Sequence, residues 1–494
     1  MAVIKDALPY ILPTLTQIVN CSLETGVFPT AWKKAEVIPL LKEGDYEIPN
    51  NNRPVSLLVA ASKICERVVL KQLTEYMTKK KKFTKHQSGN RKLHSTETLN
   101  IFISDLILQS MDRREVTALL LLDLSKAFDS LDHFILLRKL SNIGISKPAL
   151  FWFKSYLTGR CQSVRIASVL SDECEITRGV PQGSILGPVL FNIYINDLPG
   201  VPKESNLESY VDDSKIYLAF SIRDAELAAM KLTEDMRRIT AWCCLNSLLV
   251  NPEKTKLLIL DTRQMLEQEP ENFQITILGE NITPVAVAKD SGMILDSCLS
   301  YDEHIASVVS SCIAGLGQIS SVKHIFDRKT LILIINSLIF SKMYYCSAVW
   351  SNTSQRNIEK LQAVQNFAAR IVTGTRKYDH VTPVLQQLGW LPVKYMLKLR
   401  EAIFAFKCLK GLASLYLREK FHVRSDVHGV NTRQKNILDI PMYRSAASQR
   451  TFHYRVVSLW NSLPQSLENI DTLTHFKVEY KRMLLEEFLT VSGV

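Results

Sequence analysis

The sequence predicts an α+β protein in which a sheet with packed helices comes first and a helical region follows. Residues 117–122 form a continuous apolar run, which is expected of a strand buried on both faces. Two further apolar runs, residues 207–211 and 215–220, flank a pair of aspartates and predict a hairpin. Beyond about residue 299 the pattern becomes helical, and residues 355–372 form an amphipathic segment that Gly374 would cap.

The remaining elements follow from periodicity and from turn residues. Residues 1–72 mix short helical and extended segments, which glycines and prolines interrupt. Residues 96–111 place apolar side chains on one face and predict a helix. Further helices are predicted at residues 133–140, 148–157, 185–195 and 225–245, and strands at residues 163–169 and 256–260. The apolar run at residues 331–340 is too short to span a membrane, so a buried helix explains it better.

Composition restricts the class of protein. Hydrophobic residues make up 46% and charged residues 22% of the 494 residues, which is a globular balance that excludes a disordered chain. The formal net charge is +11, so a basic face that meets a polyanion such as nucleic acid is expected. The ten cysteines include no Cys-x-x-Cys pair, which argues against a zinc knuckle and favours reduced thiols in an intracellular protein. The first 20 residues do not resemble a signal peptide, and no membrane partner is expected.

Residues 79–92 carry seven lysines or arginines and no acid, with Phe83 and His86 between them. Such a segment could bind phosphates and stack a base. A solvated basic loop explains the same pattern equally well.

Three carboxylates are distinguished by their position. Asp123 ends the first buried strand, and Asp212 and Asp213 lie in the predicted hairpin turn. An acidic pair in a turn is often only a surface feature, but these acids follow apolar residues. Like charges that lose hydration repel one another, and a divalent cation offsets that cost. Mg²⁺ suits the site, because it prefers few carboxylates together with substrate phosphates.

The residues around these acids form three motifs, namely Leu-Leu-Asp-Leu-Ser-Lys-Ala-Phe-Asp at 121–129, Arg-Gly-Val-Pro-Gln-Gly-Ser-Ile-Leu-Gly-Pro at 178–188, and Tyr-Val-Asp-Asp at 210–213. In order and spacing they resemble the palm motifs of reverse transcriptases from non-LTR (LINE-type, jockey-like) retrotransposons. The resemblance covers about residues 28–460. It implies a right-hand polymerase with an antiparallel palm sheet and packed helices. The expected divisions are an N-terminal extension and fingers at 1–115, the palm with interleaved fingers elements at 116–298, a helical thumb at 299–380 and a helical C-terminal region at 381–494.

The resemblance also implies roles for individual residues. Asp123 and Asp212 would be the principal ligands of two Mg²⁺ ions, for which Mn²⁺ can substitute, with Asp213 as a supporting carboxylate. Phe128 would lie under the sugar of the incoming nucleotide and exclude a 2′-hydroxyl.

Further substrate contacts are implied outside the acids. Gln182 and Gly183 would lie beside the nucleotide and the template, the glycine allowing close backbone approach. Arg53 would contact the triphosphate and Lys42 would assist it, although both could be ordinary surface cations. Lys254 would donate a proton to the pyrophosphate.

The expected activity is RNA-directed DNA synthesis on an RNA template, from a DNA primer and deoxynucleoside triphosphates. A second hypothesis is a catalytically inactive, truncated relic that only binds nucleic acid, and a third, an RNA-dependent RNA polymerase, is disfavoured by Phe128. The resemblance begins almost at the fingers, so the N-terminal endonuclease of related elements is not expected, and no RNase H pattern appears in the sequence. The resemblance also implies that the protein lies inside the cell, in a cytoplasmic ribonucleoprotein and in the nucleus. The sequence leaves open the oligomeric state and the role of residues 381–494.

Overall fold

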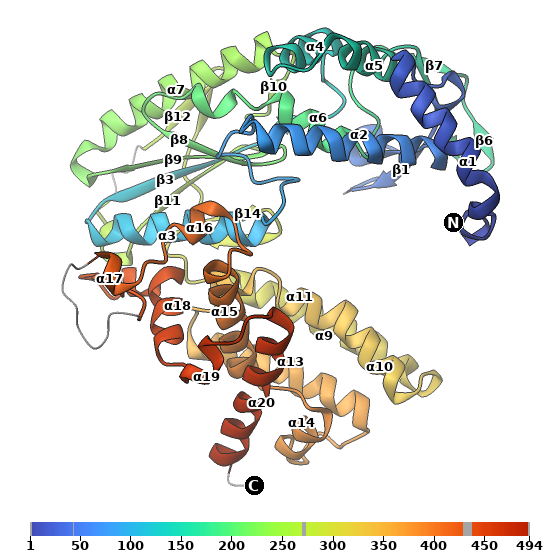
Figure 1. Ribbon diagram of the computed structural model, residues 1–494. Helices are drawn as coiled ribbons and strands as arrows, with labels where there is room; N and C mark the ends of the chain where they lie inside the picture. The colour runs from blue at the N-terminus through green and yellow to red at the C-terminus, as the bar shows by residue number, and fades with distance from the viewer. Residues whose placement is uncertain (1, 43, 269–272, 428–436, 493–494) are drawn as a thin grey trace.

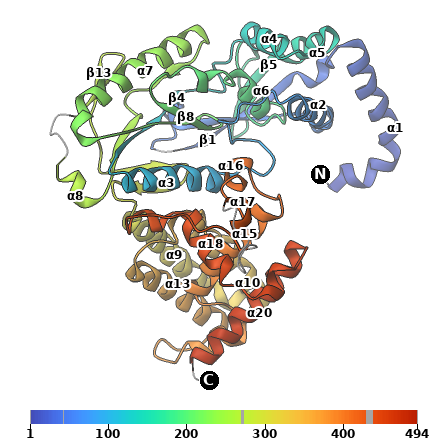
Figure 2. The same cartoon turned by 60° about the vertical axis from the view of Figure 1, so that its left-hand side comes forward.

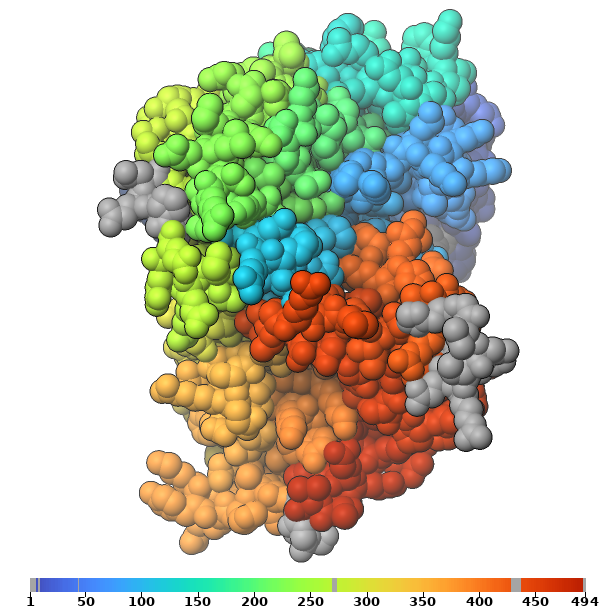
Figure 3. All heavy atoms as spheres, turned by 90° about the vertical axis from the view of Figure 1, so that its left-hand side faces the viewer, coloured from blue at the N-terminus to red at the C-terminus, as the bar shows by residue number. Residues whose placement is uncertain are grey.

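The structure is a computed structural model that describes residues 2–42, 44–268, 273–427 and 437–492. Figure 1 shows an upper part that contains the sheets and a lower part built of helices. Helix α3 (Thr96–Asp112) lies between the two parts. The space-filling view in Figure 3 shows the same order on one face, with blue α3 between the green and the orange segments. The predicted α+β class agrees with this architecture.

The central sheet is antiparallel and has the strand order β11-β3-β9-β8. Its strands are β3 (Val116–Leu122), β8 (Asn206–Tyr210), β9 (Asp213–Phe220) and β11 (Lys256–Leu260). Both faces are covered, and successive β3 side chains enter different cores: Leu119 packs with α3 below, and Leu120 packs in the core above. The continuous apolar run in β3 therefore reflects burial on both faces, as predicted.

Helices cover the upper face of the central sheet, as Figure 1 shows. They include α2 (Ala60–Lys79), α6 (Gly187–Tyr194) and α7 (Ala225–Leu245), whose apolar side chains share one core with β3 and β9. Helices α4 (His133–Asn142) and α5 (Lys147–Leu157) lie beyond them. The predicted helices in this part are confirmed to within a few residues at each end.

A second sheet lies beside the first and has the order β2-β1-β5-β6, with β7 (Cys174–Ile176) also paired to β5. Strands β1 (Lys34–Leu41) and β2 (Asn52–Leu57) are antiparallel, whereas β1 and β5 (Arg160–Ile166) are parallel. The prediction of one strand at residues 163–169 is wrong. Strand β5 ends at Ile166, Ala167 adopts a left-handed φ of 53°, and a short antiparallel strand β6 (Val169–Leu170) follows.

Helix α1 (Ala2–Thr25) runs along the outside of the upper part, and Figure 2 shows that much of it stands away from the sheets. It is attached to α5, where Trp152 Nε1 donates a hydrogen bond to Ser22 Oγ at 3.0 Å.

The lower part is helical, as predicted, and its helices share a core with α3 and with the lower face of the central sheet. The main helices are α9 (Asp302–Val322), α10 (Arg328–Ile335), α13 (Gln355–Thr373), α15 (Val393–Leu409), α18 (Phe452–Asn461) and α20 (Leu473–Ser492). Gly374 caps α13 with φ 74°, as predicted.

Two segments of the lower part bear on membrane insertion. Residues 331–340 form the end of α10 and a π-helical turn, and Leu333 and Leu338 are more than half exposed, so the predicted buried helix is only partly correct. Among the described helices, only Asp302–Ile325 is long and apolar enough to cross a membrane by length and composition. That is weak evidence, because a helix that contributes Ile305 and Leu316 to a protein core can pass the same test.

Helix α3 holds the lower part through its polar side chains. Asp105 accepts hydrogen bonds from the backbone N–H groups of Phe452 (2.6 Å) and His453 (3.3 Å), at the start of α18. Asp112 accepts hydrogen bonds from Ser445 N at 2.8 Å and from the hydroxyl of Ser448 at 2.6 Å. The C-terminal helices are therefore fastened to the same helix that supports the central sheet.

Candidate active site

The hairpin between β8 and β9 carries the acidic pair. Tyr210 pairs with Asp213, so the two turn residues are Val211 and Asp212, and Asp213 already belongs to β9. The expectation that both acids occupy the turn is therefore wrong for Asp213. Leu122 pairs with Ser214, which places Asp123 one residue beyond this pair and beside the turn.

The electrostatics of Asp212 show which charged groups lie close to it. Partial burial raises the pKa of the Asp212 carboxyl, and the carboxylate of Asp123 raises it further. The cationic groups of Arg53 and Lys42 act in the opposite direction and lower it. These four residues come from β3, the hairpin turn and the β1–β2 region, so the structure brings together groups that the sequence singled out separately.

Asp213 has different neighbours. Burial removes water from its carboxyl and raises its pKa, and the carboxylates of Asp212 and Asp290 raise the pKa further. Ser291 Oγ donates a hydrogen bond to Asp213 Oδ2 at 3.2 Å, which lowers the pKa, as does the ammonium group of Lys215. The carboxylate of Asp213 therefore faces the hairpin of β14 (Val287–Asp290) and β15 (Met293–Asp296), consistent with a supporting position.

The capacity for metal binding follows from these positions. Within the described ranges, no group of three or more histidine, cysteine, aspartate or glutamate side chains is arranged to hold a metal ion by itself. What the chain offers is a pair, Asp123 and Asp212, with partly lost hydration and mutual repulsion. Such a pair fits Mg²⁺, which commonly takes one or two carboxylates and completes its shell with phosphate oxygens and water.

Asp123 is held in place by the turn that precedes β11. Asn251 N donates a hydrogen bond to Asp123 O at 2.9 Å, and Asp123 N donates one to Thr255 Oγ1 at 3.4 Å. Lys254 belongs to the same turn, and its side chain is exposed. The structure thus places the Lys254 turn next to the backbone of Asp123.

Gln182 and Gly183 lie against β2. Ser56 N donates a hydrogen bond to Gln182 O at 2.7 Å, and Gln182 Nε2 donates to both carboxylate oxygens of Asp129, at 2.9 and 3.1 Å. Gly183 has φ 122°, and a Cβ atom there would lie 2.7 Å from Ser56 O. Only glycine allows this close approach between the loop and the strand.

Phe128 packs against α6. Its ring stacks on that of Phe191, with centroids 4.7 Å apart, and part of it remains exposed. Arg53 and Lys42 are exposed on the β1–β2 pair, where Arg53 is in register with Leu40. Of the predicted site residues, Asp123, Asp212, Arg53 and Lys42 are thus close enough to interact electrostatically.

The basic segment at residues 79–92 is largely exposed, as the solvated-loop alternative predicts, but some of its side chains have structural contacts. Arg91 lies over the ring of Phe83 at 5.6 Å and donates hydrogen bonds to the carbonyl oxygens of Thr84 and Gln87. His86 contacts Glu208 at 2.6 Å. Arg91, Phe83 and His86 therefore stabilise the segment, while Lys79 to Lys82, Lys85 and Lys92 remain exposed.

Sequence reasoning missed Gln87, which is 1% exposed and contacts the aspartate turn directly. Gln87 Oε1 accepts a hydrogen bond from Val211 N at 2.9 Å, and Gln87 Nε2 donates one to Val211 O at 3.1 Å. No local pattern could have found this contact, because 124 residues separate the partners.

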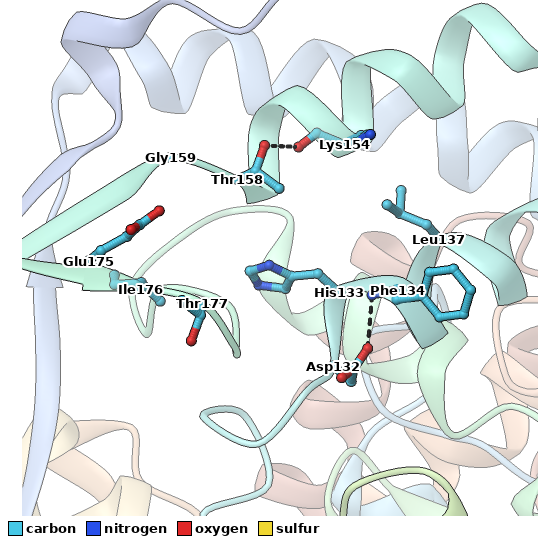
Figure 4. A pocket seen from close by; sticks show the side chains of 10 residues that line it. All are labelled: Asp132, His133, Phe134, Leu137, Lys154, Thr158, Gly159, Glu175, Ile176 and Thr177. Carbon is cyan, nitrogen blue, oxygen red and sulfur yellow. Dashed lines mark hydrogen bonds between the residues drawn. The ribbon is translucent and has the colours of Figure 1, made fainter.

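A cavity of about 400 Å³ lies elsewhere, between the start of α4, the end of α5 and β7. Figure 4 shows the ring of His133 near Thr177 in its lining. None of the predicted site residues lines this cavity.

Comparison with known proteins agrees with the geometry. Residues 40–282 match the family described as "Reverse transcriptase (RNA-dependent DNA polymerase)". The predicted right-hand polymerase class is confirmed on this basis.

Curated relatives match outside that segment as well. The chain is 30% identical over 389 residues to the probable RNA-directed DNA polymerase from transposon BS of Drosophila melanogaster, covering 76% of this chain and 42% of that protein. It is 26% identical over 382 residues to the corresponding protein of transposon X-element from the same organism, covering 76% and 41%. It is 26% identical over 389 residues to the RNA-directed DNA polymerase from mobile element jockey of the same organism, covering 76% and 42%. The chain thus spans about two fifths of the length of these relatives.

Among solved structures, the apo telomerase from Candida Tropicalis is similar, with a TM-score of 0.41 and 12% identity over 78% of this chain and 67% of that chain.

Proposed function

Because residues 40–282 form a reverse transcriptase domain, homologous to those of jockey-like non-LTR retrotransposons, we propose that the chain is an RNA-directed DNA polymerase. It adds deoxynucleotides to the 3′-end of a DNA primer on an RNA template. One observation carries the proposal: Asp123 and Asp212 interact at the end of the central sheet, and Arg53 and Lys42 lie within electrostatic reach of them.

The carboxylates of Asp123 and Asp212 would hold the divalent cations, two Mg²⁺ or Mn²⁺ ions. Bound there, such ions would supply positive charge that favours ionisation of the primer 3′-hydroxyl and departure of the pyrophosphate. Asp213 supports the pair from β9 without facing the same way, because its carboxylate accepts the hydrogen bond from Ser291. The turn that carries Lys254 fixes the backbone of Asp123, and Lys254 donates a proton to the pyrophosphate.

The nucleotide lies between the acids and the β1–β2 strands. Arg53 and Lys42 bind its triphosphate, since both are exposed cations on the side that faces Asp212. Gln182 and Gly183 border its base, and the ring of Phe128, fixed by Phe191, excludes a 2′-hydroxyl.

We propose the same divisions as the sequence predicts: an N-terminal extension and fingers at residues 1–115, the palm with interleaved fingers elements at 116–298, a helical thumb at 299–380 and a helical C-terminal region at 381–494. The net charge of +11 suits the nucleic-acid partners. We place the protein in a cytoplasmic ribonucleoprotein and in the nucleus, and we propose no membrane partner.

Primer extension tests the proposal. The full chain is incubated with a labelled DNA primer on an RNA template, deoxynucleoside triphosphates and Mg²⁺ or Mn²⁺, and stepwise elongation is expected. Asp212→Asn serves as the control and should abolish elongation.

The other candidates give different results. An inactive relic binds the template–primer with strong salt dependence but extends nothing with either metal. An RNA polymerase extends with ribonucleotides in preference to deoxynucleotides. Elongation that survives in Asp212→Asn would contradict the proposed metal ligands.

A further inference from the structure

The turn that carries Asp212 has an unusual backbone. Val211 adopts φ 60°, in the left-handed region. A β-branched side chain rarely occupies this region, because its Cβ substituents crowd the backbone. Such a conformation persists only where the surroundings hold it.

Gln87 supplies that support with both ends of its amide. Its Oε1 accepts hydrogen bonds from Val211 N at 2.9 Å and from Gly89 N at 2.7 Å, and its Nε2 donates to Val211 O at 3.1 Å. The orientation of the amide follows from its partners, because a flipped side chain would oppose two N–H groups with its own NH₂ and a carbonyl with its own oxygen. The buried side chain of Gln87 is thus hydrogen-bonded to both the backbone N–H and the backbone C=O of Val211.

The segment around Gln87 is itself fixed to the sheet edge. Ser88 N donates to Ser209 O and Ser209 N donates to His86 O, both at 2.8 Å, so the segment pairs with β8 in a parallel bridge. Asn192, on α6, donates a hydrogen bond to Gly89 O at 2.6 Å.

Gly89 closes the contact from the same side. A Cβ atom on Gly89 would lie 2.4 Å from Val211 Cγ2 and 2.5 Å from Val211 N, so the two backbones can approach only because residue 89 is glycine.

We propose that Gln87 is a positioning residue of the polymerase reaction, which holds the Val211 peptide in its left-handed conformation and thereby fixes Asp212 opposite Asp123. The inference rests on the proposed function and extends it to a residue that touches no substrate. Without the hydrogen bonds from Gln87, Val211 relaxes toward negative φ and the carboxylate of Asp212 turns away from Asp123.

Gln87→Met tests the inference, because methionine has nearly the same shape but cannot form the hydrogen bonds. The expected result is a fall of roughly 10²-fold in the kcat of primer extension, as a displacement of about 1 Å at a reacting centre produces. The Mg²⁺ concentration for half-maximal activity should rise, while the KM for template–primer stays unchanged, since Gln87 is only 1% exposed and offers almost no surface for nucleic acid to contact.

Gln365→Met is the matched control. Gln365 is also 1% exposed, and its Nε2 donates to Leu391 O at 2.9 Å in the lower part. Gln365→Met should lower the thermal midpoint by about as much as Gln87→Met does, and it should leave the Mg²⁺ requirement at the wild-type value. An equal kcat loss in both variants would show a general loss of stability and overturn the inference.

A double-mutant cycle tests the mechanism. Glycine adopts φ 60° without strain, so in a Val211→Gly background Gln87→Met should cost much less activity than in the wild type. An unchanged cost would refute the role of the strained backbone.

Hydrogen exchange keeps the inference separate from the proposed function, because it needs no activity. The amide of Val211 should exchange faster in Gln87→Met than in Gln365→Met. If the wild-type chain extends no primer but the Val211 amide still exchanges faster in Gln87→Met, the polymerase proposal is rejected and the hold of Gln87 on the turn stands. Unchanged exchange in Gln87→Met would reject that hold.

Discussion

Replacing Lys215 with methionine tests the buried ion pair behind the aspartate turn. Lys215 Nζ lies 2.6 Å from Asp290 Oδ2, and the two side chains are 2% and 3% exposed. The ammonium group also donates a hydrogen bond to Asn100 Oδ1 on α3. Lys215→Met keeps the length of the side chain but leaves Asp290 buried without its counter-charge.

The expected cost is about 3–5 kcal/mol in the free energy of unfolding, which is typical when one partner of a buried pair is removed. That is a large part of the roughly 5–15 kcal/mol by which proteins are stable. Urea denaturation followed by circular dichroism measures it. The double variant Lys215→Met/Asp290→Asn should recover most of the loss, because no unpaired charge remains.

An exposed pair of equal length provides the control. Lys34 Nζ lies 2.6 Å from Glu173 Oε1, but these side chains are 69% and 52% exposed. Water replaces the lost partner there, so Lys34→Met should have little effect on unfolding. The reasoning fails if Lys215→Met costs no more than Lys34→Met, or if the double variant is no more stable than Lys215→Met.

Three further results are expected. Burial and a neighbouring carboxylate raise the pKa of Asp212 above 3.8, so ionising it costs stability above the raised pKa. Without metal, Asp212→Asn should therefore raise the thermal midpoint at neutral pH. The difference should vanish below about pH 3.8, where the carboxyl is protonated in both the folded and the unfolded state. A midpoint of Asp212→Asn at or below that of the wild type at neutral pH would contradict this. Gly183→Ala should destabilise the chain by about 1–3 kcal/mol and slow extension, because its Cβ meets Ser56 O, whereas Gly200→Ala, with open space, should not. Phe128→Ala should raise the ribonucleotide-to-deoxynucleotide ratio of kcat/KM, and an unchanged ratio would remove its role in sugar selection.

Local sequence patterns predicted the features that local physics controls. The apolar run of β3 and the two runs around Asp212 gave the strands, because burial on one or both faces leaves a periodic signature. The break of the strand at Ala167 escaped prediction, since nothing in the side chains of residues 163–169 signals a left-handed residue.

The missed residues act through contacts that are distant in sequence. Gln87 reaches Val211 and Lys215 reaches Asp290, and neither partner lies within the range of a helical or strand period. The contacts of Arg91 and His86 in the basic segment escaped prediction for the same reason. Both side chains appear free in the sequence, but in the fold they bond to Thr84 and Glu208. Residue types and spacing identify chemistry, whereas the choice between a solvated and a structural charge depends on tertiary contacts.

The shared support of helix α3 determines which parts of the molecule can move. The lower helices and the underside of the central sheet belong to one core, and Asp105 and Asp112 bind the lower helices to α3. An outward rotation of the lower part would therefore disrupt that core. Strands β1 and β2, all of whose residues are described, lie outside both large cores, although Ala35 and Val37 of β1 are buried. The segment that carries Arg53 is therefore less tied to the central sheet than the aspartates are, and we expect a nucleotide to be enclosed by movement of these strands rather than of Asp123 and Asp212.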